Sequence, residues 1–167
     1  MKQLAGHNLA QLNVARLVAD PDSPRVAPFI RAIDRINGIG KRSDGFVWMM
    51  EGSGAPNTGA TDIRVGCNQR DISNLTVWKD VQSLEDFVWQ TVHRQFYERR
   101  AEWFKMLQKQ HFVMWWIPKG STPSLEEALA RLDHLNTHGN TDHAFGWSHL
   151  EDAKLWRTNN CSPLAAE

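Results

Sequence analysis

The stretch Asn74-Leu75-Thr76-Val77-Trp78, followed by residues 83–105, decides the expected fold and site. Side chains alternate across a strand, so the asparagine and the tryptophan of the first segment project from one face. The second segment has helical apolar spacing. Four polar residues lie among its large aromatic side chains: His93, Tyr97, Arg99 and Arg100. Proton-handling groups inside an aromatic lining favour a small-molecule pocket over a plain core.

Apolar spacing and turn residues predict the other elements. Strands are expected at 9–14, 46–50, 72–78 and 111–117. Helices are expected from Ser23-Pro24 to Gly38 and Gly40, from Ser83 with Asp86 to about Gln108, and from Ser124 with Glu127 to about His138. Residues 52–59 have the composition of a mobile loop, and residues 60–70 show no clear pattern.

This order, β-α-β-β-α-β with an extra C-terminal helix, is typical of an α+β, ferredoxin-like fold. Its four-stranded antiparallel sheet has both helices on one face. Residues 1–167 are expected to form one domain, with a core at about 7–118 and a C-terminal helix and tail at 119–167. The other sheet face needs a cover, and we expect a homodimer to supply it.

Composition narrows the partners. Nineteen Lys and Arg balance nineteen Asp and Glu, so no basic field is present to attract nucleic acid or an anionic membrane. Residues 1–8 lack the apolar run of a secretory signal, and no stretch reaches the ~20 apolar residues of a membrane span. Cys67 and Cys161 lie far apart. We therefore expect a cytoplasmic protein with reduced thiols and a small-molecule substrate.

Two helix residues allow two interpretations each. At about 100° per residue, Arg99 falls within the apolar stripe of Val92 and Trp103, while His93 and Tyr97 line the adjacent flank. Arg99 either extends its charged end to solvent or binds an anionic ligand in a pocket. His93 is either a border residue of the core or a group that transfers protons near neutral pH.

The sheet residues also allow two interpretations. Either Asn13, Trp48, Asn74 and Trp78 face a pocket under the helices, or they face a dimer partner. We favour the pocket, because buried amides at an interface need hydrogen-bond partners. Trp115 and Trp116 must lie on opposite faces, and the sequence does not decide which one joins the helix-facing core.

Seven segments resemble the uncharacterised DUF3291 family and cover nearly the whole chain to about Phe145. They are 9–17 (LAQLNVARL), 45–48 (GFVW), 60–64 (ATDIR), 77–78 (VW), 87–93 (FVWQTVH), 99–104 (RRAEWF) and 124–129 (SLEEAL). The family name implies no activity. More distantly, the chain is similar to the antibiotic-biosynthesis-monooxygenase group of dimeric α+β barrels, whose pocket lies between sheet and helices.

The distant resemblance implies two site layouts. Cofactor-free, quinone-forming members use an asparagine and a tryptophan four apart on the third strand and an arginine on the next helix, which Asn74, Trp78 and Arg99 match. Heme-degrading members use an asparagine, a tryptophan and a heme-ligating histidine, for which Asn13, Trp78 and His93 are candidates. The tyrosine of some quinone-forming members has no clear match, since Tyr97 lies on the helix.

The hypothesis we favour is a cofactor-independent monooxygenase acting on an electron-rich aromatic or polyketide-type substrate in secondary metabolism. Its predicted catalytic residues are His93, Arg99, Asn74 and Trp78. Its predicted substrate-binding residues are Asn13, Trp48, Tyr97, Arg100, Trp103 and Trp115. No metal or other cofactor is expected. The alternatives are a heme protein with His93 as ligand, a cofactor-free lyase, isomerase or cyclase, and a ligand-binding dimer without catalysis.

Overall fold

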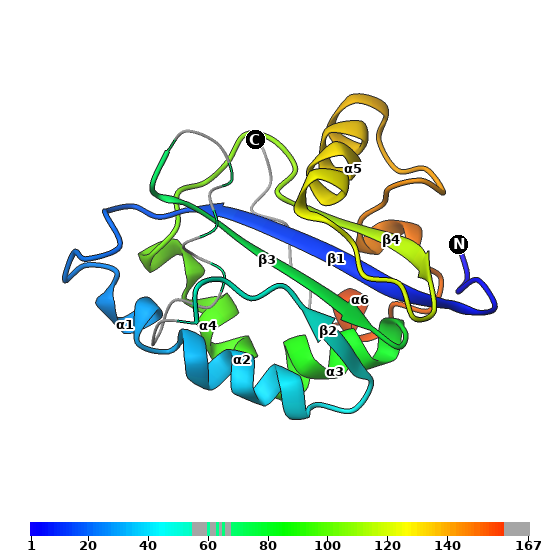
Figure 1. The fold of residues 1–167 in the computed structure, drawn as a ribbon, viewed down its shortest axis with the longest axis horizontal. Helices are drawn as coiled ribbons and strands as arrows, with labels where there is room; N and C mark the ends of the chain where they lie inside the picture. Colours follow the sequence, from blue (N-terminus) through cyan, green and yellow to red (C-terminus); the bar gives the residue numbers. More distant parts are fainter. Residues whose placement is uncertain (55–59, 61–62, 64, 66–67, 159–167) are drawn as a thin grey trace.

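One antiparallel sheet of four strands organises the molecule, in the spatial order β2-β3-β1-β4 (Figure 1). The strands are β1 (His7–Arg16), β2 (Phe46–Met49), β3 (Asp71–Trp78) and β4 (Phe112–Pro118). The computed structural model describes residues 1–54, 60, 63, 65 and 68–158. This order confirms the predicted ferredoxin-like α+β fold. Most of the expected loop at 52–59, parts of the 60–70 segment and both cysteines lie outside the described residues.

Strand register sorts the side chains of the sheet into two faces. Gln11 pairs with Thr76 across β1 and β3, and Asn13 pairs with Asn74. On the other side of β1, Gln11 pairs with Met114 of β4. Paired residues share a face, so these polar groups form one band. Leu12, Leu75 and Val113 lie on the opposite face, in an apolar core.

The first predicted helix is two helices, α1 (Ala27–Ile30) and α2 (Ile33–Arg42). The Ala32 N–H bonds to the Phe29 carbonyl, three residues back, so a tighter turn separates them. Ser23 is not the N-cap, because its hydroxyl accepts the N–H of Arg25 before the helix begins at Ala27. The predicted stop at Gly38 and Gly40 is also wrong, since α2 continues to Arg42.

The predicted continuous helix from 83 to 108 is also wrong. It is divided into α3 (Val81–Gln90), α4 (His93–Glu98) and a 3-10 turn, η1 (Arg100–Glu102). Asp80 caps α3 by accepting the Ser83 N–H at 2.8 Å, so Ser83 is not the cap. The chain becomes extended at Thr91, whose hydroxyl donates to the Phe87 carbonyl at 2.6 Å. This competing bond ends the helix and changes the direction of the residues that follow.

The predicted C-terminal helix is confirmed as α5 (Leu125–His138), capped by Ser124, which accepts the Glu127 N–H. It packs on the face opposite α1–α4, against a core that includes Trp115. Figure 1 shows α5 on the other side of the sheet from α2 and α3. The chain therefore covers part of its own second face, which corrects our reason for expecting a dimer there.

The segment after α5 returns to the sheet. Phe145 forms a short antiparallel bridge with Met114 of β4, and a 3-10 turn, η2 (Trp147–His149), follows. A last short helix, α6 (Leu155–Thr158), lies against α3 because Glu85, fully buried in α3, accepts the N–H groups of Lys154 and Trp156. Within the described residues, no helix is long and apolar enough to cross a membrane.

Candidate functional site

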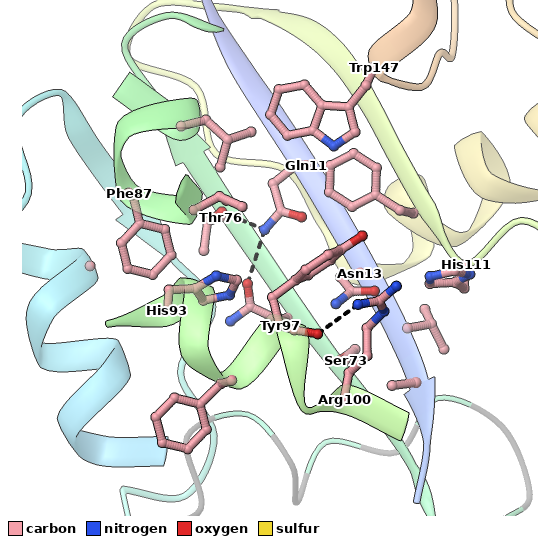
Figure 2. Close-up of a pocket in the computed structure, with 18 of the residues that line it drawn as sticks. Gln11, Asn13, Ser73, Thr76, Phe87, His93, Tyr97, Arg100, His111 and Trp147 are labelled. Carbon is pink, nitrogen blue, oxygen red and sulfur yellow. Dashed lines mark hydrogen bonds between the residues drawn. The ribbon is translucent and has the colours of Figure 1, made fainter. Parts of the chain in front are cut away.

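A cavity of about 480 Å³ lies between the sheet and the helices α2–α4. Its floor is the polar band of β1 and β3, and its walls are mostly aromatic (Figure 2). The aromatic wall residues come from several elements: Phe29, Phe46, Phe87, Phe96, Tyr97, Phe104, Phe112 and Trp147. Its volume falls within the ~300–1,000 Å³ typical of small-molecule sites.

Hydrogen bonds fix the floor before any ligand binds. Gln11 donates through Nε2 to Thr76 Oγ1 at 2.7 Å and to Asn74 Oδ1 at 3.0 Å. Trp78 donates through Nε1 to the same Thr76 oxygen at 2.8 Å. Thr76 Oγ1 therefore accepts two bonds and holds both donors in place. A floor ordered in this way does not need to be reorganised by a ligand.

His93 projects from the start of α4 toward this floor (Figure 2). Its ring lies 4.9 Å from the ring of Phe87, which stacks on Trp78. Its Nδ1 is buried without a hydrogen-bond partner among the described residues. Burial disfavours the charged imidazolium and lowers the pKa of His93 to about 4, while the nearby Val88 backbone opposes the shift. The imidazole is therefore neutral near pH 7.

Arg100 enters the other end of the cavity. Its guanidinium stacks 4.1 Å from the centre of the Tyr97 ring and donates to the Tyr97 carbonyl at 2.8 Å. Figure 2 shows it reaching between Asn13 and His111. Burial, followed by the positive charge of Arg100, lowers the pKa of His111, and a hydrogen bond with the Lys109 backbone opposes this. This end of the cavity is therefore positively charged.

A protein-family model, "Domain of unknown function (DUF3291)", matches residues 8–161. The chain belongs to the DUF3291 family. No curated protein is significantly similar to it in sequence. The family assignment agrees with the resemblance found in the sequence and carries no activity with it.

Solved structures similar to this DUF3291 protein have low sequence identity. SnoaB, a cofactor-independent oxygenase from Streptomyces nogalater, is 14% identical with a TM-score of 0.45, over 72% of this chain and 99% of that one. Protein SO0527 from Shewanella oneidensis is 8% identical with a TM-score of 0.46, over 69% and 95%. PA3566 from Pseudomonas aeruginosa is 9% identical with a TM-score of 0.44, over 71% and 100%.

In the DUF3291 chain, six of the ten predicted site residues line the cavity. They are Asn13, Asn74, Trp78, His93, Tyr97 and Arg100. Asn13 lies on β1, next to β3, which carries Asn74 and Trp78, and α4 with His93 and Tyr97 lies on the same side of the sheet as α2 and α3 (Figure 1). The structure thus brings together the residue types that the sequence singled out, while their catalytic or binding roles stay predictions.

Arg99 does not belong to this set, which corrects its predicted place. Its side chain is 55% exposed and forms a bidentate ion pair with Glu102, both bonds at 2.8 Å. This pairing raises the pKa of Arg99 and lowers that of Glu102. The break at Thr91 explains the error, because the expected helical phase assumed an uninterrupted helix. Arg100, one of the predicted substrate-binding residues, does line the cavity.

Three tryptophans predicted to bind substrate also lie elsewhere. Trp48 pairs with Val77 and packs against the core beneath α5, as does Trp115. Trp116, on the opposite face from Trp115, joins the core beside α3. Trp103 is buried against Phe29 and Phe96 and does not line the cavity. Strand alternation left open which face of the sheet carries the Trp48 side chain. In the structure, a register shift between Phe46 and Trp48 places it on the face beneath α5.

Sequence reasoning missed several cavity residues in this DUF3291 protein. Gln11 lies two residues before Asn13 on β1, and Thr76 two residues after Asn74 on β3. Strand alternation alone indicates that each pair shares a face, so this signal was available. His111, Lys105 and Trp147 reach the cavity only through the fold, and no local pattern marks them.

The described side chains bear on whether the protein holds a metal ion or heme. No group of three or more His, Cys, Asp or Glu suited to a metal ion exists among the described residues. A heme-ligating histidine needs an open position beside the bonding nitrogen, whereas Nδ1 of His93 is enclosed and its ring packs on Phe87. The residues around His93 Nδ1 do not fit iron ligation through that atom.

Proposed function

We propose that this protein is a small-molecule enzyme that deprotonates an electron-rich aromatic or polyketide-type substrate in the cavity and oxygenates it without a cofactor. The observation that carries the proposal is the neutral imidazole of His93, held over a preformed amide floor inside an aromatic cavity. Aromatic walls suit a planar substrate, and a neutral imidazole is a proton acceptor.

In the proposed reaction, His93 takes a proton from an activated CH₂ of the substrate, which leaves an enolate or phenolate-conjugated carbanion. Asn74, in the floor beneath the substrate, stabilises this charge. The developing anion raises the pKa of the nearby imidazole, which makes His93 a stronger base when it is needed. The carbanion then reduces oxygen; one oxygen atom becomes the new carbonyl and the other leaves as water.

The experiment is oxygen uptake by purified, metal-free protein with a panel of phenols and cyclic ketones carrying an activated CH₂. One carbonyl product per oxygen consumed is expected. His93→Ala should lower turnover by about 10²–10⁴-fold, the usual contribution of a general base. His138→Ala is the matched control, because His138 is exposed on α5. Equal turnover by wild-type protein and His93→Ala would rule out the proposed base.

The same proton abstraction also serves a lyase, isomerase or cyclase, and anaerobic assays separate these reactions from oxygenation. Product formed without oxygen at an unchanged rate assigns the cavity to that second class. A binding protein without catalysis is favoured by the enclosure of His93 Nδ1, since a buried group with a pKa of about 4 is a weak base in the free protein. Saturable binding without any turnover would support this reading.

We also propose that the protein is a homodimer. The edge strand β2 leaves Val47 exposed, and Trp48 and Met50 are only partly buried against the core beneath α5. Sedimentation velocity at micromolar concentration tests this, and a monomer at all concentrations would overturn it.

A further inference from the structure

Three arginines occupy one short segment, and two of them are already paired. Arg94 forms an ion pair with Glu98 at 2.8 Å, and Arg99 pairs with Glu102. Both pairs lie at the surface. Arg100, which is half-buried, forms no salt bridge with any described carboxylate, and it contacts the ring and the carbonyl of Tyr97. Burying part of a guanidinium without a negative partner costs free energy. A bound anion would supply that partner.

The cavity around Arg100 has an unequal charge distribution. Arg100 and Lys105 both line it, and no Asp or Glu occurs among the described lining residues. His111 lies on the same side as Arg100, and the positive charge there disfavours its protonation. The opposite part of the cavity, near Phe87 and Trp78, is aromatic. The site is therefore amphipathic along its length, with a cationic end and an aromatic end.

We infer that the ligand of this cavity is a planar aromatic acid, whose permanently ionised carboxylate is received by the Arg100 guanidinium while its rings lie over the amide floor toward Phe87. The Arg100 fork suits bidentate recognition of a planar carboxylate. Stacking on Tyr97 holds the fork at one orientation, so little side-chain entropy is lost when the carboxylate binds. This inference rests on the proposed function for the use of the cavity and adds the substrate class.

The test uses two matched probes, 2-naphthoate and its neutral isostere 2-naphthamide, titrated by calorimetry at neutral pH. Wild-type protein should bind the carboxylate about tenfold more tightly than the amide or better, since a hydrogen bond to a charged group is stronger than one between neutral groups. Arg100→Gln should abolish this preference, because it weakens binding of the carboxylate far more than binding of the amide. Arg100→Lys, which keeps the charge and loses the fork, should retain part of the preference.

Arg99→Gln is the matched control, because it removes the same charge one residue away at an exposed, paired position. It should keep the full preference for the carboxylate, and thermal melting of each variant confirms that it is folded. Equal binding of both probes by wild-type protein overturns the inference and leaves the proposed cavity function standing. If Arg99→Gln and Arg100→Gln lose the preference for the carboxylate equally, the preference comes from net charge and not from the Arg100 fork. That result overturns the inference as well. Binding of neither probe overturns both the inference and the proposed function.

Discussion

Gln11 and Thr76 face each other across β1 and β3, and Gln11 Nε2 donates to Thr76 Oγ1 at 2.7 Å in the floor of the cavity. The same oxygen accepts Trp78 Nε1 at 2.8 Å. The Thr76 hydroxyl is thus an acceptor shared by the Gln11 amide and the Trp78 indole, and both of these side chains line the candidate site. Its hydroxyl links the stability of the sheet to the shape of the cavity.

Replacing this acceptor should therefore destabilise the protein. Thr76→Val keeps the shape of the side chain but leaves two buried donors without that acceptor, and we expect the free energy of unfolding to fall by about 2–4 kcal/mol. Thr76→Ser keeps the oxygen and should lose only a methyl group, at a smaller cost. Urea unfolding of both variants measures the difference. Equal stability of the two variants would show that the hydroxyl does not hold the floor.

His93 should make the stability depend on pH. Its pKa is about 4 in the folded protein, against 6.5 for an ordinary histidine, so between these pH values the unfolded chain binds a proton that the folded chain does not. The free energy of unfolding should therefore fall as the pH decreases from 6.5 toward 4, by roughly 3 kcal/mol in total at 1.36 kcal/mol per pKa unit. Urea unfolding at several pH values measures this slope.

His93→Phe should reduce that slope, because it removes the titrating ring while keeping an aromatic side chain beside Phe87. His138→Gln removes an exposed histidine and serves as its control. An unchanged slope in His93→Phe would mean that other groups cause the loss of stability in acid.

Glu85 should hold the C-terminal segment against the cavity. Its buried carboxylate accepts the N–H groups of Lys154 and Trp156 at 3.0 and 2.7 Å, and Trp156 lines the cavity. Glu85→Ala should release residues 154–158, seen as faster hydrogen exchange of these two amides. Glu85→Gln keeps one acceptor oxygen and should exchange at an intermediate rate. Protected amides in Glu85→Ala would show that other contacts dock the segment.

Gly45 should be intolerant of any side chain. Its φ is +74°, and an added Cβ would collide with the Ser83 side chain in the first turn of α3. Gly45→Ala should cost more than 2 kcal/mol, combining backbone strain of about 1–2 kcal/mol with this overlap. Gly54→Ala isolates the strain, because Gly54 has a φ of +78° and no atom within 4 Å of the added Cβ. Equal melting temperatures for both variants would mean that the Ser83 contact relaxes freely.

The sequence by itself determined the fold class, the four strands and α5, because strand alternation, turn residues and the Ser124 cap are local signals. It also indicated that Asn74 and Trp78 share a face, since the period of a strand leaves no choice once the strand is recognised. The family resemblance came from residues spread along nearly the whole chain.

Only the tertiary structure decided which residues meet in the cavity. A side-chain bond from Thr91 to the Phe87 carbonyl ends α3. After this break Arg99 pairs with Glu102 at the surface, while Arg100 lines the cavity. The cover of the second sheet face also depended on α5 folding back over β1 and β4, a contact between distant parts of the chain. Layer packing arises from such non-local contacts, which a periodic pattern in one segment does not contain.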